Sequence, residues 1–239
     1  TKILPISYLL IILAIFFNYQ FFSGLQEIII FSYLMIISKY FYDLSNTKNL
    51  NFLLIMILYL NLIFWTKTEG LVYMLIFLLL INFKSTILNK DKIIFSSVML
   101  LLIIFKTSIY NFYGLNLNAQ PLYNLEYIKD LGFDVLLLKI KYISIWFAYY
   151  SLNNIFFISG LFFILYSNFD KKFYNENIKL LNLYIFLIVS FIFSAYILRD
   201  QDIIYSIRTT MDRLVMTSSG FLVYITLANL DKIINKKLK

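Results

Sequence analysis

Long uncharged apolar runs recur along this chain, and they restrict its fold more than any other feature. Residues 50–65 and 71–83 contain no charged side chain, and similar runs precede and follow them. The chain is 61% hydrophobic and 14% charged, whereas about a quarter of a soluble domain is charged. One soluble core cannot bury so many runs, but helices that cross a bilayer can. The sequence therefore predicts an all-α, polytopic membrane protein with one transmembrane domain over residues 1–239.

A bilayer crossing takes roughly 20 helical residues. On this basis we predict eight crossings, at residues 3–22, 26–42, 50–65, 71–83, 93–111, 143–167, 178–197 and 214–230. The longest outer segment, about 106–142, begins as a loop rich in Tyr and Asn. From about residue 122 its charged and apolar positions alternate with a helical period, which predicts an amphipathic helix in the outer interface.

Charge is distributed unequally between the two sides of this layout. One set of loops is rich in lysine and carries the whole net charge of +8, because cations and anions balance on the other side. The positive-inside rule makes the lysine-rich side cytoplasmic, with both termini there. We therefore expect a multi-pass protein of the cytoplasmic (inner) membrane, surrounded by membrane lipids. Topology explains the basic charge without a nucleic-acid partner, and the mixed-charge outer face is where we expect function.

The residue types that are absent limit the chemistry. The chain has no His and no Cys. An imidazole base, a Ser–His–Asp triad, a disulfide and a His or Cys metal site are therefore impossible. The cofactor stays unknown, and a divalent cation bound by oxygen ligands stays an open alternative.

Two outer segments hold scarce charged side chains. In "FWTKTEGLVY", Lys67 and Glu69 separate two apolar runs. One interpretation is that they are only the polar ends of two helices in a tight turn that Gly70 permits. A turn at the outer interface avoids the cost of about 2.5–3.5 kcal/mol for a charge at the bilayer centre. In "FFSGLQEIII", Glu27 opens the second predicted span, where the helix dipole alone favours a carboxylate.

The third segment, "ILRDQDIIYSIRTTMDRLVMTSSGF", contains all three arginines: Arg199, Arg208 and Arg213. Because lysine is the usual cation elsewhere, this choice suggests that the guanidinium fork matters, and the fork suits phosphate or carboxylate. Thr209 and Asp212 have the spacing of a capping box, which predicts a helix N-terminus suited to phosphate. The alternative is that Arg208 pairs with Asp212 while Arg213 snorkels to the interface.

Taken in order, "SGLQEIII", "WTKTEGLVYMLIFLLL" and "IRTTMDRLVMTSSGFL" resemble membrane glycosyltransferases of the GT-C fold. The resemblance is to the bacterial branch related to protein O-mannosyltransferases and the aminoarabinose transferase. Glu27 stands at the acidic position that opens a span, Thr68 replaces an Asn in the hairpin, and Asp212 and Arg213 match the late Asp-Arg element. The resemblance implies a cell-envelope transferase that moves a hexosyl or pentosyl group from a polyprenyl-phosphate-linked donor to a protein, lipid or glycan acceptor on the extracytoplasmic side.

Carried over residue by residue, the resemblance implies that Glu27 and Glu69 are catalytic. Four residues would bind substrate: Lys67, Arg208, Asp212 and Arg213. In the family the principal catalytic acid lies in a first outer loop that nothing here matches, so we expect an N-terminal part before Thr1. Two alternatives remain open, a transporter and a non-catalytic membrane subunit. Transporters place ionisable groups near the bilayer midplane, and the predicted span centres here are uncharged.

Overall fold

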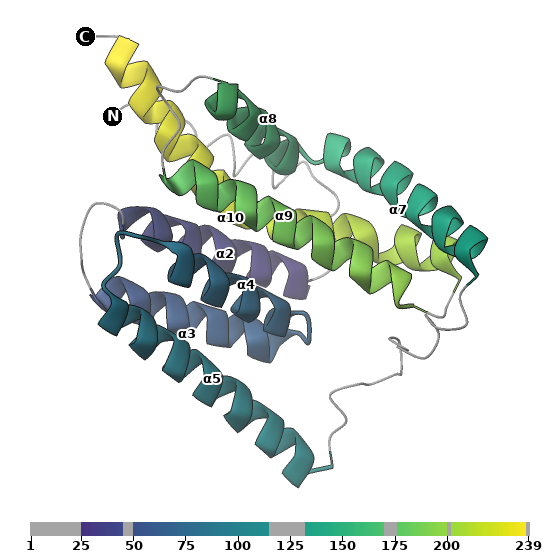
Figure 1. The fold of residues 1–239 in the computed structure, drawn as a ribbon, viewed down its shortest axis with the longest axis horizontal. Coiled ribbons are helices and arrows are strands. Elements are labelled where there is room, and N and C mark those ends of the chain that lie inside the picture. Colours follow the sequence, from purple (N-terminus) through teal and green to yellow (C-terminus); the bar gives the residue numbers. More distant parts are fainter. Residues whose placement is uncertain (1–24, 45–49, 115–131, 170–175, 200–201, 238–239) are drawn as a thin grey trace.

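The computed structural model describes residues 25–44, 50–114, 132–169, 176–199 and 202–237 (Figure 1). All regular secondary structure in these residues is helical, and they form no β-strand, which confirms the all-α fold class. The described helices are α2 (Leu25–Asp43), α3 (Leu50–Thr66), α4 (Gly70–Phe83), α5 (Asn89–Phe112), α7 (Phe133–Asn153), α8 (Ile155–Phe169), α9 (Glu176–Ile197) and α10 (Ile203–Lys237).

Three of the described helices, α5, α7 and α9, are long and apolar enough to cross a membrane. Helices α3, α4 and α8 are also apolar but shorter, with 17, 14 and 15 residues. The first predicted crossing, residues 3–22, lies outside the described residues. The full count of eight crossings therefore stays a prediction.

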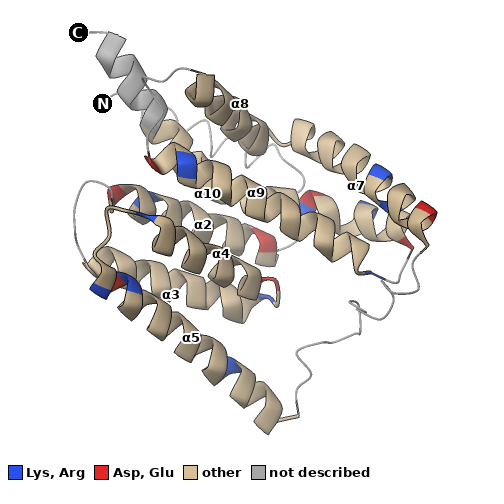
Figure 2. Cartoon of the chain, viewed as in Figure 1, with Lys and Arg blue, Asp and Glu red and all other residues tan. Residues whose placement is uncertain are grey.

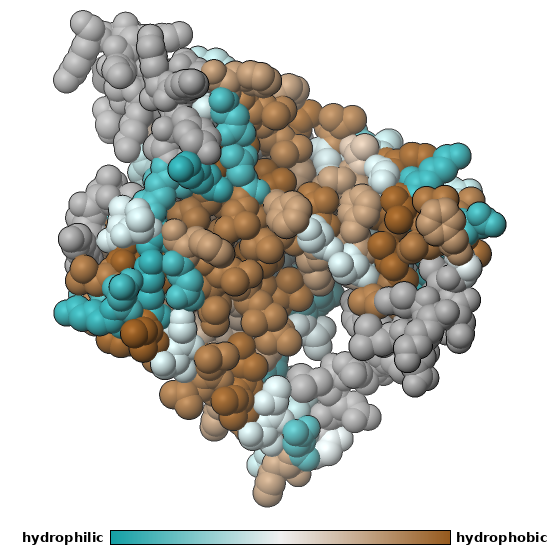
Figure 3. Space-filling model, viewed as in Figure 1, coloured by the Kyte–Doolittle hydropathy of each residue, from teal (hydrophilic) through white to brown (hydrophobic). Residues whose placement is uncertain are grey.

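The outer surface of the helices supports contact with lipid. Charged side chains lie mostly toward the helix ends (Figure 2), and the visible faces between them are largely apolar (Figure 3). On α5, Leu101 and Phe105 are 63% and 60% exposed, and Leu138 on α7 is 53% exposed. Apolar exposure of this extent suits hydrocarbon better than water. Together with the three long apolar helices, it indicates a membrane protein.

Helix α10 organises the packing, since it contacts α2, α7, α8 and α9. Its fully buried Phe221 lies among aromatic rings from three other helices. The centre of the Phe221 ring is 4.5 Å from that of Tyr184 on α9, 4.9 Å from Phe77 on α4 and 5.4 Å from Phe41 on α2. Tilted and edge-to-face rings at these distances attract one another in addition to burying apolar area. This aromatic core fixes α10 against α2, α4 and α9.

Small residues bring α10 close to α2. A Cβ atom at Gly220 would lie 2.4 Å from the carbonyl oxygen of Phe31 on α2, so the two backbones touch at this glycine. One residue further on, the carbonyl oxygen of Phe221 accepts a hydrogen bond of 2.6 Å from the Ser38 hydroxyl. Close backbone approach at small residues, joined by a hydroxyl hydrogen bond, is typical of helix pairs in membranes.

The structure corrects the sixth predicted crossing, residues 143–167, because two helices replace one. Helix α7 ends at Asn153, and Asn154 has an extended backbone with φ −95° and ψ 104°. The Asn154 side-chain oxygen accepts hydrogen bonds from the backbone N–H groups of Phe156 (3.1 Å) and Phe157 (2.9 Å). Asn154 therefore caps the start of α8, as asparagine commonly does. The break could not be predicted from hydropathy, because the stretches on both sides of it are apolar.

The predicted outer segment 106–142 is also partly wrong. Residues 106–112 belong to α5 and residues 133–142 to α7, while residues 115–131, with most of the predicted interfacial helix, lie outside the described part. Lys106 can lie inside a helix because its ammonium group donates to the carbonyl oxygen of Phe64 near the end of α3. The same group lies 4.0 Å from the centre of the Phe64 ring. A cation at a helix C-terminus is favourable.

Two phenylalanine substitutions test the aromatic core. Phe221→Ala should lower the free energy of unfolding by about 3–5 kcal/mol, because it leaves a cavity among three rings. Phe186→Ala on α9 is the matched control: its ring is 66% exposed, and removal should cost less than about 1 kcal/mol. Unfolding in detergent micelles, followed by circular dichroism, measures both. Equal losses would mean that Phe221 is not in the core.

Candidate functional site

The charged hairpin is a tight turn between α3 and α4, as its sequence predicts. The N–H of Lys67 donates to the carbonyl oxygen of Ile63 (3.2 Å), and the N–H of Gly70 donates to the carbonyl oxygen of Lys67 (3.0 Å). A Cβ atom at Gly70 would lie 2.5 Å from the carbonyl oxygen of Ile63. Gly70 is needed for this close approach of the two helix ends, and not for a left-handed backbone.

Glu27 meets this hairpin from another helix. It lies in the first turn of α2, as the sequence predicts, and only 6% of its side chain is exposed. Its Oε1 lies 3.0 Å from the Nζ of Lys67, within hydrogen-bond distance. A buried carboxylate is costly without such a partner. The positive end of the α2 dipole stabilises it further.

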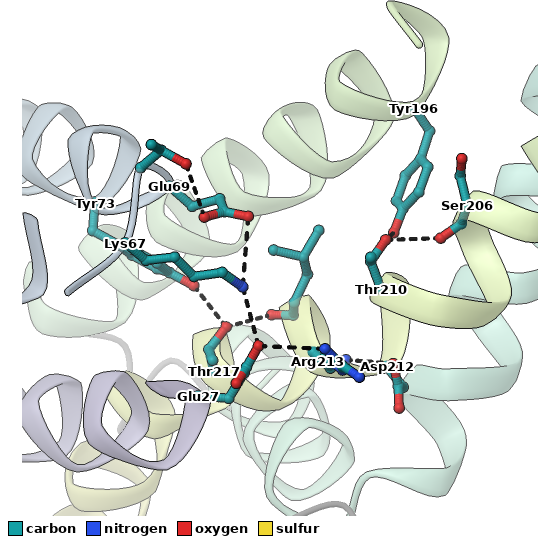
Figure 4. Close-up of polar contacts among 12 residues, drawn as sticks. Glu27, Lys67, Glu69, Tyr73, Tyr196, Ser206, Thr210, Asp212, Arg213 and Thr217 are labelled. Carbon is teal, nitrogen blue, oxygen red and sulfur yellow. Dashed lines mark hydrogen bonds and ion pairs between the residues drawn. The ribbon is translucent and has the colours of Figure 1, made fainter. Parts of the chain in front are cut away.

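Arg213 reaches the same carboxylate from α10. Its Nη1 lies 3.9 Å from the Oε1 of Glu27, and the Nζ of Lys67 also lies 3.6 Å from the Oε1 of Glu69 (Figure 4). We call Glu27, Lys67, Glu69 and Arg213 the ion-pair cluster. The fold therefore brings the three charged segments together, and the roles of their residues stay predictions.

Exposure differs within the ion-pair cluster. Glu27 is buried, whereas the side chains of Lys67, Glu69 and Arg213 are 28%, 23% and 41% exposed. The Arg213 guanidinium lies 3.9 Å from the Glu27 carboxylate, which is too long for a hydrogen bond, and it also interacts electrostatically with the Asp212 carboxylate. The cluster thus has a closed inner end at Glu27 and an open outer end, where Arg213 still has donors for an anion.

A hydrogen bond lies beside the ion-pair cluster and joins the helices that carry it. The hydroxyl groups of Tyr73 on α4 and Thr217 on α10 are 3.0 Å apart and buried (Figure 4). Tyr73 lies one helical turn after Glu69, and Thr217 one turn after Arg213. This bond holds α4 to α10 next to the charges. Sequence reasoning missed it, although the four-residue spacing on both helices was a usable signal.

The predicted capping box at Thr209 and Asp212 is wrong. Helix α10 already begins at Ile203, where the Asp202 side chain accepts the N–H of Ile204 (2.9 Å) and acts as the N-cap. Thr209 therefore lies inside the helix, and its hydroxyl donates to the carbonyl oxygen of Tyr205 (2.9 Å). Asp202 had the same capping chemistry seven residues, or about two turns, earlier. Arg213 therefore lies ten residues after the start of α10, and the N-terminus of this helix is not beside it.

The three arginines do not act as a group. The Arg199 guanidinium lies over the Tyr196 ring at 5.1 Å and donates to Thr210 (3.3 Å). Arg208 does not pair with Asp212 within 4 Å in the described part of the chain. Its guanidinium instead lies 5.6 Å from the centre of the Trp146 ring on α7. Of the predicted substrate-binding residues, Lys67 and Arg213 therefore belong to the ion-pair cluster. Asp212 lies close enough to interact with it electrostatically, and Arg208 lies against α7 instead.

The described residues contain no group of three acidic side chains that could hold a metal ion. No family model, curated protein or solved structure matches this chain. The resemblance to GT-C enzymes therefore rests on the three quoted segments alone.

Double-mutant cycles test the difference between the two ion pairs of Lys67. The cycle with Lys67→Met and Glu27→Gln should give an interaction energy of about 1–3 kcal/mol, because Glu27 is buried. The cycle with Lys67→Met and Glu69→Gln should give less than about 1 kcal/mol, because that pair is longer and more exposed. Chemical unfolding in detergent measures both, and a larger value for the Glu69 cycle would contradict this geometry.

Proposed function

We propose that this chain is a membrane glycosyltransferase that moves a sugar from a polyprenyl phosphate to an acceptor on the extracytoplasmic side. The supporting observation is that Glu27, the hairpin and Arg213 meet in one ion-pair cluster. These are the three segments that resemble GT-C enzymes. The three segments are far apart in the sequence, so tertiary packing and not local structure brings them together.

Helix directions and charge support the outer location. The ion-pair cluster lies at the start of α2 and at the turn from α3 to α4, which is one end of these three helices, and Arg213 joins it from a point ten residues after the start of α10. The turn from α4 to α5, with Lys84 and Lys90, lies at the opposite end of the same helices. If the protein lies in the inner membrane, the positive-inside rule places the lysine-rich end in the cytoplasm. The ion-pair cluster then faces outward, where lipid-linked sugars are presented.

The cations of the ion-pair cluster suit the phosphate of the donor. Arg213 can form the paired, charge-assisted hydrogen bonds that phosphate favours, and its side chain is 41% exposed. Lys67 lies 3.0 Å from the same Glu27 oxygen and provides a second cation. Two fixed cations stabilise the negative charge that grows on the phosphate oxygen as the sugar departs.

The proposed reaction is a displacement at the anomeric carbon. The bond between this carbon and the phosphate oxygen breaks, and its electron pair leaves with the polyprenyl phosphate. The acceptor hydroxyl oxygen forms the new glycosidic bond and loses its proton to a carboxylate. Glu69 is better suited to accept the proton, because its one ion pair in the cluster is long, at 3.6 Å. Glu27 is held by two cations and is a weaker base, so its part is to position Lys67 and Arg213.

Donor binding by Arg213 variants tests this proposal. In the full chain in nanodiscs, Arg213→Ala should weaken the binding of undecaprenyl phosphate by at least about tenfold, since a charge-assisted hydrogen bond contributes about 1.5–3 kcal/mol. Arg213→Lys should lie between Arg213→Ala and the natural chain, because it keeps the charge but loses the fork. Competition with a fluorescent polyprenyl phosphate measures the affinities.

Lys90→Ala, an exposed cation at the opposite end, is the control and should bind like the natural chain. Glu69→Gln should also retain binding, but it should slow sugar transfer into a membrane fraction by about 100-fold or more. Unchanged binding in both Arg213 variants would contradict the phosphate role. Normal transfer by Glu69→Gln would rule out Glu69 as the base. Binding without any sugar transfer by the natural chain would make a lipid-phosphate transporter or a non-catalytic subunit the better explanation.

A further inference from the structure

An aromatic surface lies on α7 beside the ion-pair cluster. The rings of Trp146 and Tyr150 are stacked, with centres 5.8 Å apart and planes inclined by 27°. Tyr149 contacts both rings edge-on, at 5.6 Å and 5.3 Å, and is 54% exposed. Trp146 and Tyr150 are half-buried, so parts of their rings remain open. Three large amphipathic rings are thus gathered within little more than one turn of α7.

Charged groups from α10 border this surface. The exposed Arg208 guanidinium lies over the Trp146 ring at 5.6 Å. The carboxylate of Asp212, one turn later on α10, is close enough to interact electrostatically with Tyr150 on α7 and with Glu27 and Arg213 of the ion-pair cluster. Asp212 therefore lies within electrostatic range of both the aromatic surface and the ion-pair cluster.

This combination matches the chemistry of a sugar ring. A pyranose or furanose presents an apolar C–H face, which packs on an aromatic ring, and a rim of hydroxyl groups, which takes charged donors and acceptors. Trp146 and Tyr150 provide the ring surface, Arg208 provides donors, and Asp212 provides an acceptor. An acyl chain would need neither charge, and a phosphate alone would have no use for the rings or for Asp212.

We infer that Trp146, Tyr150, Arg208 and Asp212 form the subsite for the sugar ring of the lipid-linked donor. The inference rests on the proposed function, because Arg213 and Lys67 hold the adjoining phosphate. A donor bound in this way has its anomeric carbon between the two regions, within reach of the carboxylates of the ion-pair cluster. Trp146 then determines which sugars are accepted, and Arg208 and Asp212 recognise their hydroxyl groups.

The chain contains two tryptophans, so Trp65→Phe leaves Trp146 as a specific fluorescent reporter. The probes are undecaprenyl phosphate and its mannose, glucose and arabinose derivatives, added to the full chain in nanodiscs. At least one sugar derivative should bind about three- to tenfold more tightly than undecaprenyl phosphate, which corresponds to one aromatic stacking contact. The same derivative should shift the Trp146 emission, and undecaprenyl phosphate should not.

Variants separate this inference from the proposed function. Trp146→Ala should abolish the preference for the sugar derivative but leave undecaprenyl phosphate binding intact, whereas Trp146→Phe should retain part of the preference. Tyr166→Ala, an exposed tyrosine on α8, is the control and should retain all of it. Competition with a fluorescent polyprenyl phosphate measures the ratio of the two affinities in each variant, and it does not depend on the fluorescence of Trp146.

The outcomes are distinct. An equal preference in Trp146→Ala and the natural chain, or no preference for any sugar, would overturn the subsite and make the rings interface anchors. That result leaves the phosphate role standing if Arg213→Ala still weakens undecaprenyl phosphate binding. Loss of the preference in Trp146→Ala, with no effect of Arg213→Ala, would support the subsite and remove the assigned phosphate site. If no polyprenyl phosphate binds, both proposals fail.

Discussion

The buried carboxylate of Glu27 is the constraint on which this arrangement depends. A carboxylate removed from water must be paired, and here its partners are Lys67 at 3.0 Å and Arg213 at 3.9 Å. These partners come from the α3–α4 hairpin and from α10, so one charge ties together three separate parts of the chain. The buried hydrogen bond between Tyr73 and Thr217 also joins α4 to α10, one helical turn from the ion-pair cluster. Structure and proposed chemistry therefore share one set of interactions, and stability measurements alone cannot separate them.

Away from the ion-pair cluster, packing determines how firmly it is held. Helix α10 approaches α2 at Gly220 and places Phe221 among rings of α2, α4 and α9. The contact between Gly220 and Phe31 fixes how far α10 is shifted along α2. Arg213 and Glu27 lie on the same two helices, so this contact also fixes their relative position. Aromatic rings and small residues thus build a rigid base, and the open cations stand at one end of it. A rigid scaffold of this kind suits a site that must hold charges before the substrate arrives.

Much of this arrangement could be predicted from the sequence, for identifiable reasons. Long uncharged runs and the strong turn signal at Gly70 made the helices and the hairpin predictable, and the rarity of charge drew attention to Glu27, Lys67 and Arg213. The sequence could not predict the break at Asn154, because a single capping side chain makes it inside an apolar run. The capping box failed because Asp202 offered the same chemistry earlier in the chain. The Arg208–Trp146 contact joins residues distant in sequence, which no local pattern encodes.

The central claim is that the ion-pair cluster faces away from the cytoplasm, and cysteine labelling tests it most directly. Because the chain has no cysteine, Thr68→Cys in the hairpin and Lys90→Cys at the opposite end each provide a single exposed thiol. A membrane-impermeant maleimide is applied to intact cells and to lysed cells. We expect position 68 to react in intact cells and position 90 only after lysis. Reaction of position 90 in intact cells, with position 68 protected until lysis, would contradict it.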